Sequence, residues 1–589
     1  MNVILAVKMY VTKMAEESGP GMKVLLMDKV TTSIVSMVYS QSEILQKEVY
    51  LFERLDSPSS TEPMKHLKCI VFIRPTKDNI GLLCNELRNP RYGMYYIYFS
   101  NIISKADIKT LAECDEIEVV REVQEFYGDY LAVSPHLFTL NINGCSQDLD
   151  WNPTHLQRCT QGITAVLLSL KKCPYIRYQG SSGMAKKLSE KIREILTKES
   201  SLFDYRQPDV PPLLLILDRR SDAITPLLTQ WTYQAMVHEL LTISNNRVNL
   251  SRIPGISKDL SEVVLSSEHD EFYADNLYLN YGEIGQTMKE LIDEFQKKAK
   301  SHQKVESVTD MKAFVEHYPN FKKMSGTVSK HLVIIGELSS LVTKRSLLEV
   351  SEMEQEMACQ DQHSQHLHRL KSLIHNSKIM NEDACRLVMI YALRYNKHSN
   401  CDISSLIDAL KKRGVPESLY KMVYNMLEYG SQSFETTIEP NLVAQDAVVK
   451  ITKRFFKDLK GVENVYTQHV PILKETLDEL IKGRLKENFF PFLGRSPANK
   501  RVQDVIVFII GGVTYEEALC VHLLNKSSAN SGVRIVLGGT TIHNTTSFID
   551  EVGTATFGGA LIKHICRRSK HSTSSIYICK DLSCFFFSV

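Results

Sequence analysis

The sequence has no hydrophobic run long enough to cross a membrane. No stretch of 18 apolar residues occurs, and the longest candidate, Val505–Val513, is nine residues long and contains two glycines. Such a run is expected to form a buried strand. The first 17 residues carry two lysines inside an apolar pattern and no small-residue cleavage site, so they predict an amphipathic helix and not a signal peptide. The apolar face of that helix would be formed by Val3, Val7, Val11 and Met14.

Neither sign of charge dominates the composition. Lys and Arg number 70 and Asp and Glu number 68, so the formal net charge is +2. This balance creates no overall field that would attract nucleic acid or an anionic membrane, and we expect no nucleic-acid partner. The 13 cysteines form no Cys-x-x-Cys pair, which is typical of a reducing compartment and speaks against a disulfide framework. These features predict a cytoplasmic protein that recognises its partners through local surfaces.

The motifs of common α/β enzymes are also missing. Neither Gly-x-Gly-x-x-Gly nor the Walker pattern follows a strand-like run, and neither Gly-x-Ser-x-Gly nor His-Glu-x-x-His occurs. The bulky residues Met27–Val30 after the first such run would keep a backbone away from a pyrophosphate. His363, His366 and His368 have no fourth ligand at metal spacing, so we expect them to be solvated. The sequence thus predicts no cofactor and no metal.

Three weaker patterns have two interpretations each. Gly180–Lys187 resembles a phosphate loop, but its glycine spacing is wrong and a simple loop into a helix is favoured. Gly511-Gly512 and Gly538-Gly539 could hold an anion at a helix start, although tight strand-to-helix turns explain both pairs. Asp218–Asp222 follows a buried strand, where open α/β sheets place active sites. Pairing of these charges with their neighbours is the favoured reading, and an enzyme site is the alternative.

The length of 589 residues suits three to five domains of about 100 to 200 residues. The pattern of predicted helices and strands changes twice along the chain. Residues 23–230 alternate short apolar runs with helical patterns, which indicates a parallel sheet covered by helices. Helical periodicity dominates residues 235–470, with a hairpin-like interruption at Val263–Tyr273. The α/β texture returns after residue 500, where Thr514–Glu517 forms a capping box.

Two segments are predicted to pack poorly. Residues 344–383 are rich in Glu, Gln, His and Lys, which predicts an exposed helix or a mobile loop. Residues 553–589 lose periodicity and mix glycine, serine and basic residues, which predicts a poorly ordered tail.

Two long segments carry a resemblance to a known family. Leu214–Leu241 closely resembles the signature of the SM (Sec/Munc-like, syntaxin-binding) proteins. Phe508–Ala518 together with Val533–Thr541 resembles a second hallmark of the same family. The resemblance covers residues 1–552 and implies an arch of three domains that combines α/β and α folds. The implied division is a first α/β domain at 1–130, a second at 131–240 and 470–552, a mostly helical domain at 241–469, and an atypical tail at 553–589.

The resemblance also implies a non-enzymatic function. Family members bind Qa-SNAREs (syntaxins) and promote SNARE complex assembly for vesicle fusion. The implied partners are a Qa-SNARE of the syntaxin-16 type and an endosomal Rab effector of the rabenosyn type. The implied location is the cytoplasm, with peripheral association of a monomer with trans-Golgi and endosomal membranes through its partners. The alternatives are a metabolic α/β enzyme with a site at Asp218–Asp222 and a helical scaffold for vesicle tethers.

Family members hold an N-terminal syntaxin peptide in an apolar pocket on the first domain. The residues that match this pocket are Ile103, Ile108, Leu111, Ala112, Val119 and Val120. The residue pattern agrees in part, because Ile108, Leu111 and Ala112 share one helical face, although that face could simply cover a sheet. The resemblance predicts that Leu111→Arg abolishes peptide binding and leaves thermal stability nearly unchanged.

Two further positions match functional elements of the family. Asp28 matches a residue that lines the central cleft, where the syntaxin helices are held. Tyr318–Phe321 matches the hinge of a helical hairpin, with Pro319 at the turn, where proline would interrupt a helix. We expect this hairpin to straighten and to template SNARE helices, and a fixed corner between helices is the alternative.

Overall fold

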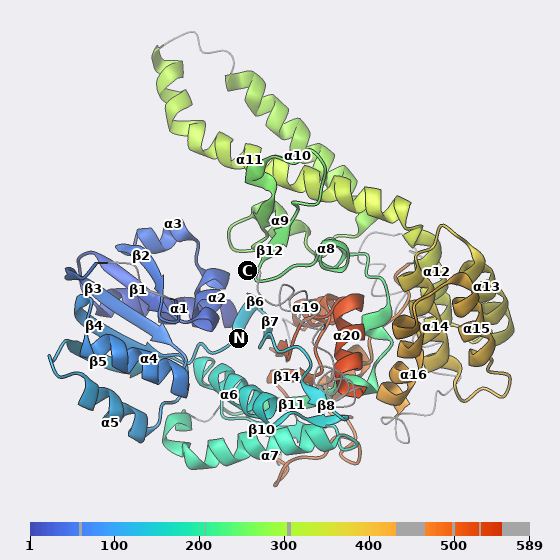
Figure 1. Ribbon diagram of the computed structural model, residues 1–589, viewed down its shortest axis with the longest axis horizontal. Helices are drawn as coiled ribbons and strands as arrows, with labels where there is room; N and C mark the ends of the chain where they lie inside the picture. Colours follow the sequence, from blue (N-terminus) through green and yellow to red (C-terminus); the bar gives the residue numbers. More distant parts are fainter. Residues whose placement is uncertain are drawn as a thin grey trace, which may run out of the picture.

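The computed structural model describes residues 1–57, 62–206, 208–302, 308–431, 466–497, 501–528 and 532–556. An α/β lobe at the N-terminus and a second α/β body lie beside each other, and a helical part rises above the body and continues to its far side (Figure 1). The combination of α/β and helical regions expected for an arch-shaped chain is therefore confirmed.

The first lobe is built on a five-stranded parallel sheet with the order β2-β1-β3-β4-β5. Its central strands are continuous apolar runs, and all five residues of β1 are buried, as expected for a sheet covered on both faces. The strands are β1 (Lys23–Met27), β2 (Val49–Arg54), β3 (Met64–Ile73), β4 (Tyr92–Phe99) and β5 (Val120–Glu125). The helices are α1 (Val3–Glu17), α2 (Lys29–Val38), α3 (Gln41–Leu45), α4 (Lys77–Arg88) and α5 (Lys105–Cys114).

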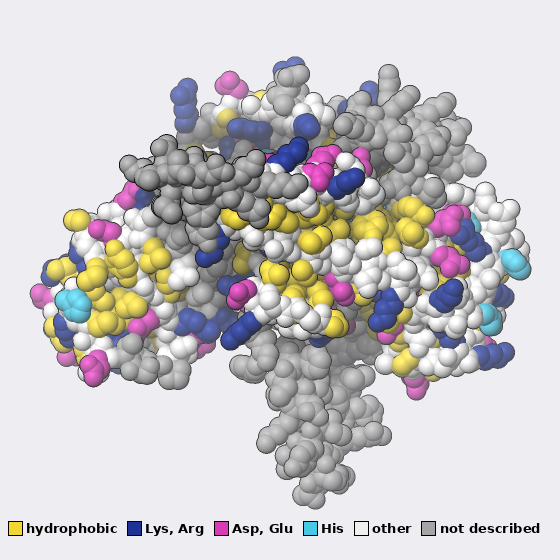
Figure 2. All heavy atoms as spheres, turned by 90° about the horizontal axis from the view of Figure 1, so that it is seen from above, with side chains coloured by type: hydrophobic (Ala, Val, Ile, Leu, Met, Phe, Trp, Pro, Cys, Tyr) yellow, Lys and Arg dark blue, Asp and Glu magenta, His cyan; other side chains and the backbone are white. Residues whose placement is uncertain are grey.

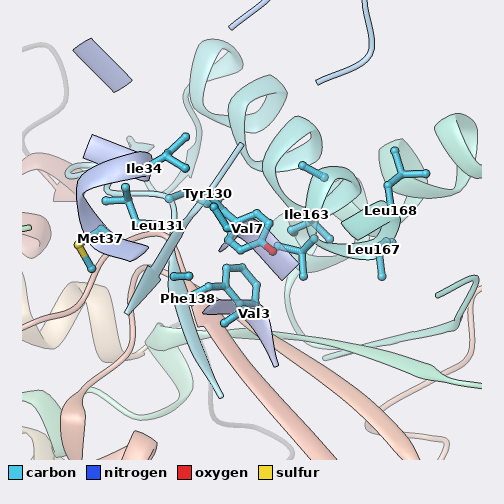
Figure 3. Packing of buried hydrophobic residues seen from close by; sticks show 14 of the residues in the cluster. Val3, Val7, Ile34, Met37, Tyr130, Leu131, Phe138, Ile163, Leu167 and Leu168 are labelled. Atoms are coloured by element: carbon cyan, nitrogen blue, oxygen red, sulfur yellow. The ribbon is translucent and has the colours of Figure 1, made fainter. Parts of the chain in front are cut away.

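The N-terminal helix α1 confirms the amphipathic pattern of the sequence. Its four predicted core residues, Val3, Val7, Val11 and Met14, are all buried. Figure 3 shows Val3 and Val7 beside Tyr130, the residue before β6 (Leu131–Ser134), and beside Phe138 of the second body. Because one hydrophobic cluster includes residues of both α/β parts, α1 helps to join the first lobe to the body.

The body contains a six-stranded sheet with the order β10-β11-β14-β15-β7-β6. The strands that lie side by side in its centre come from opposite halves of the sequence, since Leu213 of β11 pairs with Val505 of β14. The strands are β6 (Leu131–Ser134), β7 (Leu137–Thr139), β10 (Tyr175–Tyr178), β11 (Leu213–Asp218), β14 (Asp504–Ile510) and β15 (Arg534–Gly539). The remaining elements are the short strands β8 (Ser146–Gln147) and β9 (Asp150–Trp151) and the helices α6 (Pro153–Ser169), α7 (Gly183–Lys198), α8 (Tyr233–Leu241), α18 (Ile472–Ile481), α19 (Tyr515–Ser527) and α20 (Thr545–Thr556).

The two glycine pairs of the body have different roles. Gly511 and Gly512 both have positive φ and form the turn that leads from β14 to the capping box of α19, as predicted. Gly538 and Gly539 instead lie within β15, so the prediction of a second turn is wrong. Gly538 pairs with Phe508 on one side and with Phe138 on the other, and the absence of a side chain leaves room for the Phe138 ring.

The helical part has two regions. α10 and α11 form the projection at the top of Figure 1, and α12 to α16 form a bundle on the far side of the body. The helices are α9 (Glu271–Asn276), α10 (Tyr281–His302), α11 (Val308–Lys344), α12 (Leu347–Cys359), α13 (His363–His375), α14 (Asn381–Tyr395), α15 (Ile403–Arg413) and α16 (Glu417–Ser431). The hairpin-like segment contributes only β13 (Glu262–Val264), which pairs with β12 (Arg247–Asn249), and its last residues belong to α9.

The prediction that residues 344–383 pack poorly is wrong. They form α12 and α13, and most of the large apolar residues of these helices are buried in hydrophobic clusters, whereas Leu348 is exposed. The buried members are Leu347, Val350, Met353, Met357, Leu370, Leu373 and Ile374. Residues 553–556 of the predicted tail instead belong to α20, which continues through Gly553 to Thr556, and residues 557–589 lie outside the described part of the chain.

The prediction of three solvated histidines is also wrong for two of them. His363 Nε2 lies 2.8 Å from the hydroxyl of Tyr391, and His366 Nδ1 lies 2.6 Å from the hydroxyl of Tyr395. Both imidazoles are buried, and this burial lowers their pKa values. His368 alone is exposed. These partners lie on α14, which the local sequence around the histidines cannot reveal.

The contribution of His543 to the stability of the body is expected to fall on acidification. Burial lowers the pKa of His543 to about 3, although its hydrogen bond with the Gly511 carbonyl opposes this shift. At this residue the unfolded chain therefore binds more protons than the folded chain below pH 6.5, and the contribution of His543 to stability falls by about 2 kcal/mol between pH 6.5 and 5.

Urea unfolding of wild type and His543→Gln at both pH values measures this contribution. Glu516 and Glu517 act in the opposite sense, since burial raises their pKa values to about 7. The comparison with the variant cancels their effect, and an identical pH dependence of the two proteins would contradict the prediction.

Candidate partner-binding surfaces

The corner formed by α5 and the edge strand β5 is positioned by two polar side chains, one at each end of α5. Ser104 caps α5 by accepting a hydrogen bond from the Asp107 N–H at 3.1 Å. After α5 ends, the Asp115 carboxylate accepts hydrogen bonds from the N–H groups of Val119 and Val120 at 2.9 and 3.0 Å. Asp115 thus fixes the turn between the two elements, a role that was not predicted from the sequence.

The predicted peptide pocket falls on this corner, but its six residues differ in accessibility. Ile108 is 42% exposed and Ala112 is exposed, whereas Leu111 is only 4% exposed. Ile103, Leu111 and Val119 belong to the hydrophobic core under the sheet, and Val120 packs against that core. The prediction that Leu111→Arg leaves thermal stability nearly unchanged is therefore wrong, because the charge would enter a packed core.

Two exposed apolar residues of the same corner were not among the predicted pocket residues. Ile117 in the turn is 60% exposed, and Val123 on β5 is 42% exposed. The only sequence signal for Ile117 is its position between two glutamates, which is unusual for a core residue. Ile108, Ile117 and Val123 together offer apolar surface on three consecutive pieces of chain.

The charges around this corner are predominantly negative. Between Lys105 and Glu125 the sequence has seven acidic and three basic residues. Of the acidic residues, Asp115 is engaged with backbone N–H groups and Glu113 lies 3.7 Å from Lys109. An apolar surface with an acidic surrounding favours a segment that combines an apolar anchor with basic groups.

Asp28 has a structural role. It is 5% exposed, and one carboxylate oxygen caps α2 by accepting from the Thr31 N–H at 2.8 Å. The other oxygen accepts from the N–H of Arg74 and from the side chain of Asn79, both at 2.7 Å. The expectation that Asp28 lines a cleft and contacts a partner is therefore corrected, because its carboxylate is already saturated inside the lobe.

The region of α3 and β2 presents more accessible side chains than Asp28. These elements lie uppermost on the first lobe in Figure 1, and Figure 2 shows hydrophobic side chains gathered on this lobe when it is seen from above. The exposed large apolar residues of the two elements are Leu45, Tyr50, Leu51 and Phe52.

Pro319 lies inside a helix and not at a turn. α11 continues without interruption from Val308 to Lys344, so the connection to α10 is made before Val308. The prediction of a turn at Tyr318–Phe321 is wrong in this respect. The lower part of α11 is anchored by His331, whose two ring nitrogens lie 2.7 Å from the Tyr233 hydroxyl and 2.8 Å from Asp270 Oδ2.

The charges of Asp218–Asp222 pair internally, as the favoured interpretation predicted. Arg220 lies 2.6 Å from Asp218, and Arg219 forms a buried ion pair with Glu517. The Asp222 carboxylate accepts a hydrogen bond from the Thr225 N–H at 3.0 Å. Gly180–Lys187 likewise forms a loop into α7, which Ser182 caps. The charged groups of Asp218, Arg219, Arg220 and Asp222 are thus all engaged with neighbouring groups of the protein.

The described residues contain neither a metal-binding cluster nor a membrane-spanning helix. No cluster of three or more His, Cys, Asp or Glu side chains with metal-binding geometry occurs among them. Within the same ranges, every helix is too short or too polar to cross a bilayer.

Comparison with known proteins decides the family. Residues 23–551 match the model of the Sec1 family. The chain belongs to the Sec1 family. Vacuolar protein sorting-associated protein 45 of mouse is 64% identical over 553 residues, which cover 94% of this chain and 96% of the mouse protein. The protein of the same name in Dictyostelium discoideum is 44% identical over 94% of this chain and 96% of its own length.

Solved structures of Sec1-family proteins have the same fold. The SM protein Vps45, solved in complex with the Qa SNARE Tlg2, superposes with a TM-score of 0.87 at 46% identity and covers 95% of this chain and 99% of its own. Unc18 of Monosiga brevicollis, solved with syntaxin 1, matches at 20% identity with a TM-score of 0.74 over 94% of this chain and 100% of its own, which shows a common fold. Sec1-family membership makes this chain a trafficking regulator and not an enzyme.

Proposed function

We propose that this chain binds a Qa-SNARE of the syntaxin-16 type and promotes SNARE complex assembly. The observation that carries the proposal is the similarity over 95% of the chain to Vps45, a protein solved with the Qa SNARE Tlg2. The corner of α5 and β5 would hold the N-terminal peptide of the Qa-SNARE. Its apolar anchor would contact Ile108, and basic groups of the peptide would face the acidic residues around the corner.

Ile108→Arg tests the peptide site better than a substitution of the buried Leu111. Because Ile108 is 42% exposed, arginine is expected to leave thermal stability unchanged. Loss of the apolar contact, worth about 1.5 to 3 kcal/mol, would weaken binding of a synthetic syntaxin-16-type N-terminal peptide by about 10- to 100-fold in calorimetry.

Met9→Arg is the matched control, because Met9 is another exposed apolar residue on a helix packed against the first lobe. Its peptide affinity should equal that of the wild type. Undiminished binding to Ile108→Arg would remove the α5–β5 corner from the proposal.

The projection formed by α10 and α11 would template the SNARE helices. Pro319 lies within α11, where proline removes one backbone hydrogen bond and costs a helix about 3 kcal/mol. Pro319→Ala should therefore favour the straight helix and raise the rate of SNARE assembly in a liposome-fusion assay. An unaltered or reduced rate would exclude this role for α11.

We further propose the setting in which the chain acts. The three-part division at 1–130, 131–240 with 470–552, and 241–469 is supported by the six-stranded sheet, which combines strands from both outer parts of the second domain. A monomer would work at trans-Golgi and endosomal membranes and would reach them through the Qa-SNARE and a Rab effector of the rabenosyn type. The similarity to proteins named for vacuolar protein sorting supports this location.

A further inference from the structure

A cavity lies at the carboxyl ends of β11 and β14, away from the α5–β5 corner. It has a volume of 130 Å³ and is bounded by the strand ends, by α18 and by residues 484–490. An apolar cavity of about 150 Å³ holds a benzene ring, so this one has room for one aromatic ring or one branched aliphatic side chain. The apolar side chains that line it are Leu217, Ile472, Leu473, Leu485, Phe489, Phe490 and Ile509.

The cavity suits binding and not chemistry. Asp218, Arg219 and Asp222 contribute to its wall, but their charged groups pair with Arg220, Glu517 and the N-terminal part of α18. Ile472 is 38% exposed although it lies on this wall, so apolar surface remains accessible at the entrance. Apolar pockets with a few polar groups at the carboxyl ends of parallel strands are common ligand sites.

The wall provided by α18 favours a positive charge. Glu475 and Glu479 lie one helical turn apart and both line the cavity. Partial burial raises the pKa of Glu475, and the neighbouring carboxylates Glu479 and Asp478 raise it further, although Lys474 and Lys482 oppose this shift. A cation bound beside Glu475 would offset this repulsion.

The segment after α18 favours a negative charge. Arg484 and Lys486 line the cavity from this side, and the Lys486 ammonium lies 5.8 Å from the centre of the Phe489 ring. An occupant that matches both walls therefore carries an apolar group between charges of opposite sign.

We propose that this cavity binds a short linear segment of a partner protein, in which one large apolar residue is flanked by a basic residue on one side and an acidic residue on the other. The apolar side chain fills the cavity. The basic residue pairs with Glu475, since Lys482 already lies 3.6 Å from Glu479, and the acidic residue pairs with Arg484 and Lys486. This site is independent of the Qa-SNARE surface proposed above.

An array of synthetic nine-residue peptides tests the recognition pattern. The central residue is Leu, Ile, Met, Phe or Ser, and the flanking residues are Arg and Asp in both orders or two serines. We expect the full-length chain to bind apolar centres with charged flanks at least tenfold better than serine centres or serine flanks. Equal binding of all peptides, or a preference that ignores the flanks, would overturn the proposal.

Glu475→Lys tests the location of the site. The variant should bind the best array peptide at least tenfold more weakly, and replacement of the peptide arginine by glutamate should restore binding. Glu190→Lys, an exposed glutamate on α7, is the matched control and should behave as wild type. Thermal unfolding and binding of the syntaxin-type peptide verify that Glu475→Lys is folded. An unchanged preference of Glu475→Lys, or a loss of binding without rescue by the glutamate peptide, would show that the peptides bind elsewhere.

Discussion

Arg386→Met is expected to lower the free energy of unfolding by about 3 to 5 kcal/mol. Arg386 is buried on α14, where its guanidinium lies 2.7 Å from Glu354 and 3.0 Å from Asp383. A third carboxylate, that of Glu239, lies 3.6 Å away. Burial raises the pKa of Glu354, and Arg386 is the main group that opposes this shift. Without this cation, the carboxylates of Glu354 and Glu239 would lose their ion-pair partner in a low-dielectric core, whereas Asp383 would keep Arg345 at 2.8 Å.

Urea unfolding measures this loss, and Arg369→Met is the matched control. Arg369 on α13 also contacts two carboxylates, Glu352 and Glu356, both at 2.6 Å, but its pairs are partly exposed to solvent. Exposed pairs contribute about 0 to 1 kcal/mol. Equal destabilisation by the two substitutions would show that burial of the Arg386 cluster does not determine its contribution.

Gly538→Ala is expected to destabilise the body by about 3 kcal/mol, at the upper end of the cost of overpacking. A Cβ atom at position 538 would lie 2.0 to 2.4 Å from three carbons of the Phe138 ring. That ring cannot withdraw freely, because it is fully buried and stacks with Phe508 at a centroid distance of 6.2 Å. The strands on both sides of Gly538 would have to separate.

A smaller residue opposite Gly538 should relieve the overlap. Phe138→Leu combined with Gly538→Ala is expected to be less destabilising than the sum of the two single substitutions in thermal unfolding. Gly81→Ala in α4 is the control, since a Cβ atom there meets nothing within 4 Å and alanine favours the helix. Additive effects of the two substitutions would contradict the proposed contact between them.

Local patterns in the sequence predict those helices and strands that can pack against any apolar surface or against elements close by in the sequence. The spacing of Val3, Val7 and Val11 indicates α1 because any apolar surface can cover it. The same reasoning fails for α12 and α13, since Glu354, His363 and other polar residues are buried there by partners on other elements. Such long-range pairs leave no local signal, so a well-packed segment has the composition of a loop. Gly538 is a second example of a residue whose role the local sequence does not reveal, because glycine is needed there to make room for the Phe138 ring on a distant strand.

The candidate peptide site was predictable in position but not in detail. Helical spacing places Ile108, Leu111 and Ala112 on one face of α5. It does not say that Leu111 faces the core and Ile108 the solvent, because α5 packs at the edge of the sheet and the boundary between the two environments crosses that face. The prediction that Asp28 lines a cleft was wrong for a related reason. The groups that donate hydrogen bonds to its carboxylate lie on Thr31 in α2 and on Arg74 and Asn79 after β3, and the residues around Asp28 in the sequence do not reveal all of them.

The pairing of β11 with β14 has a consequence for synthesis of the chain. Leu213 can pair with Val505 only after about 290 further residues have been synthesised. A ribosome needs roughly 15 to 60 s for that length. During this time the hydrogen-bonding edge of a strand that is buried throughout in the final protein remains open. The mostly helical domain at 241–469 is therefore synthesised before β14 and β15 can complete the six-stranded sheet. A newly made chain therefore needs protection at β11, and we expect chaperone occupancy to be highest while this domain is being translated.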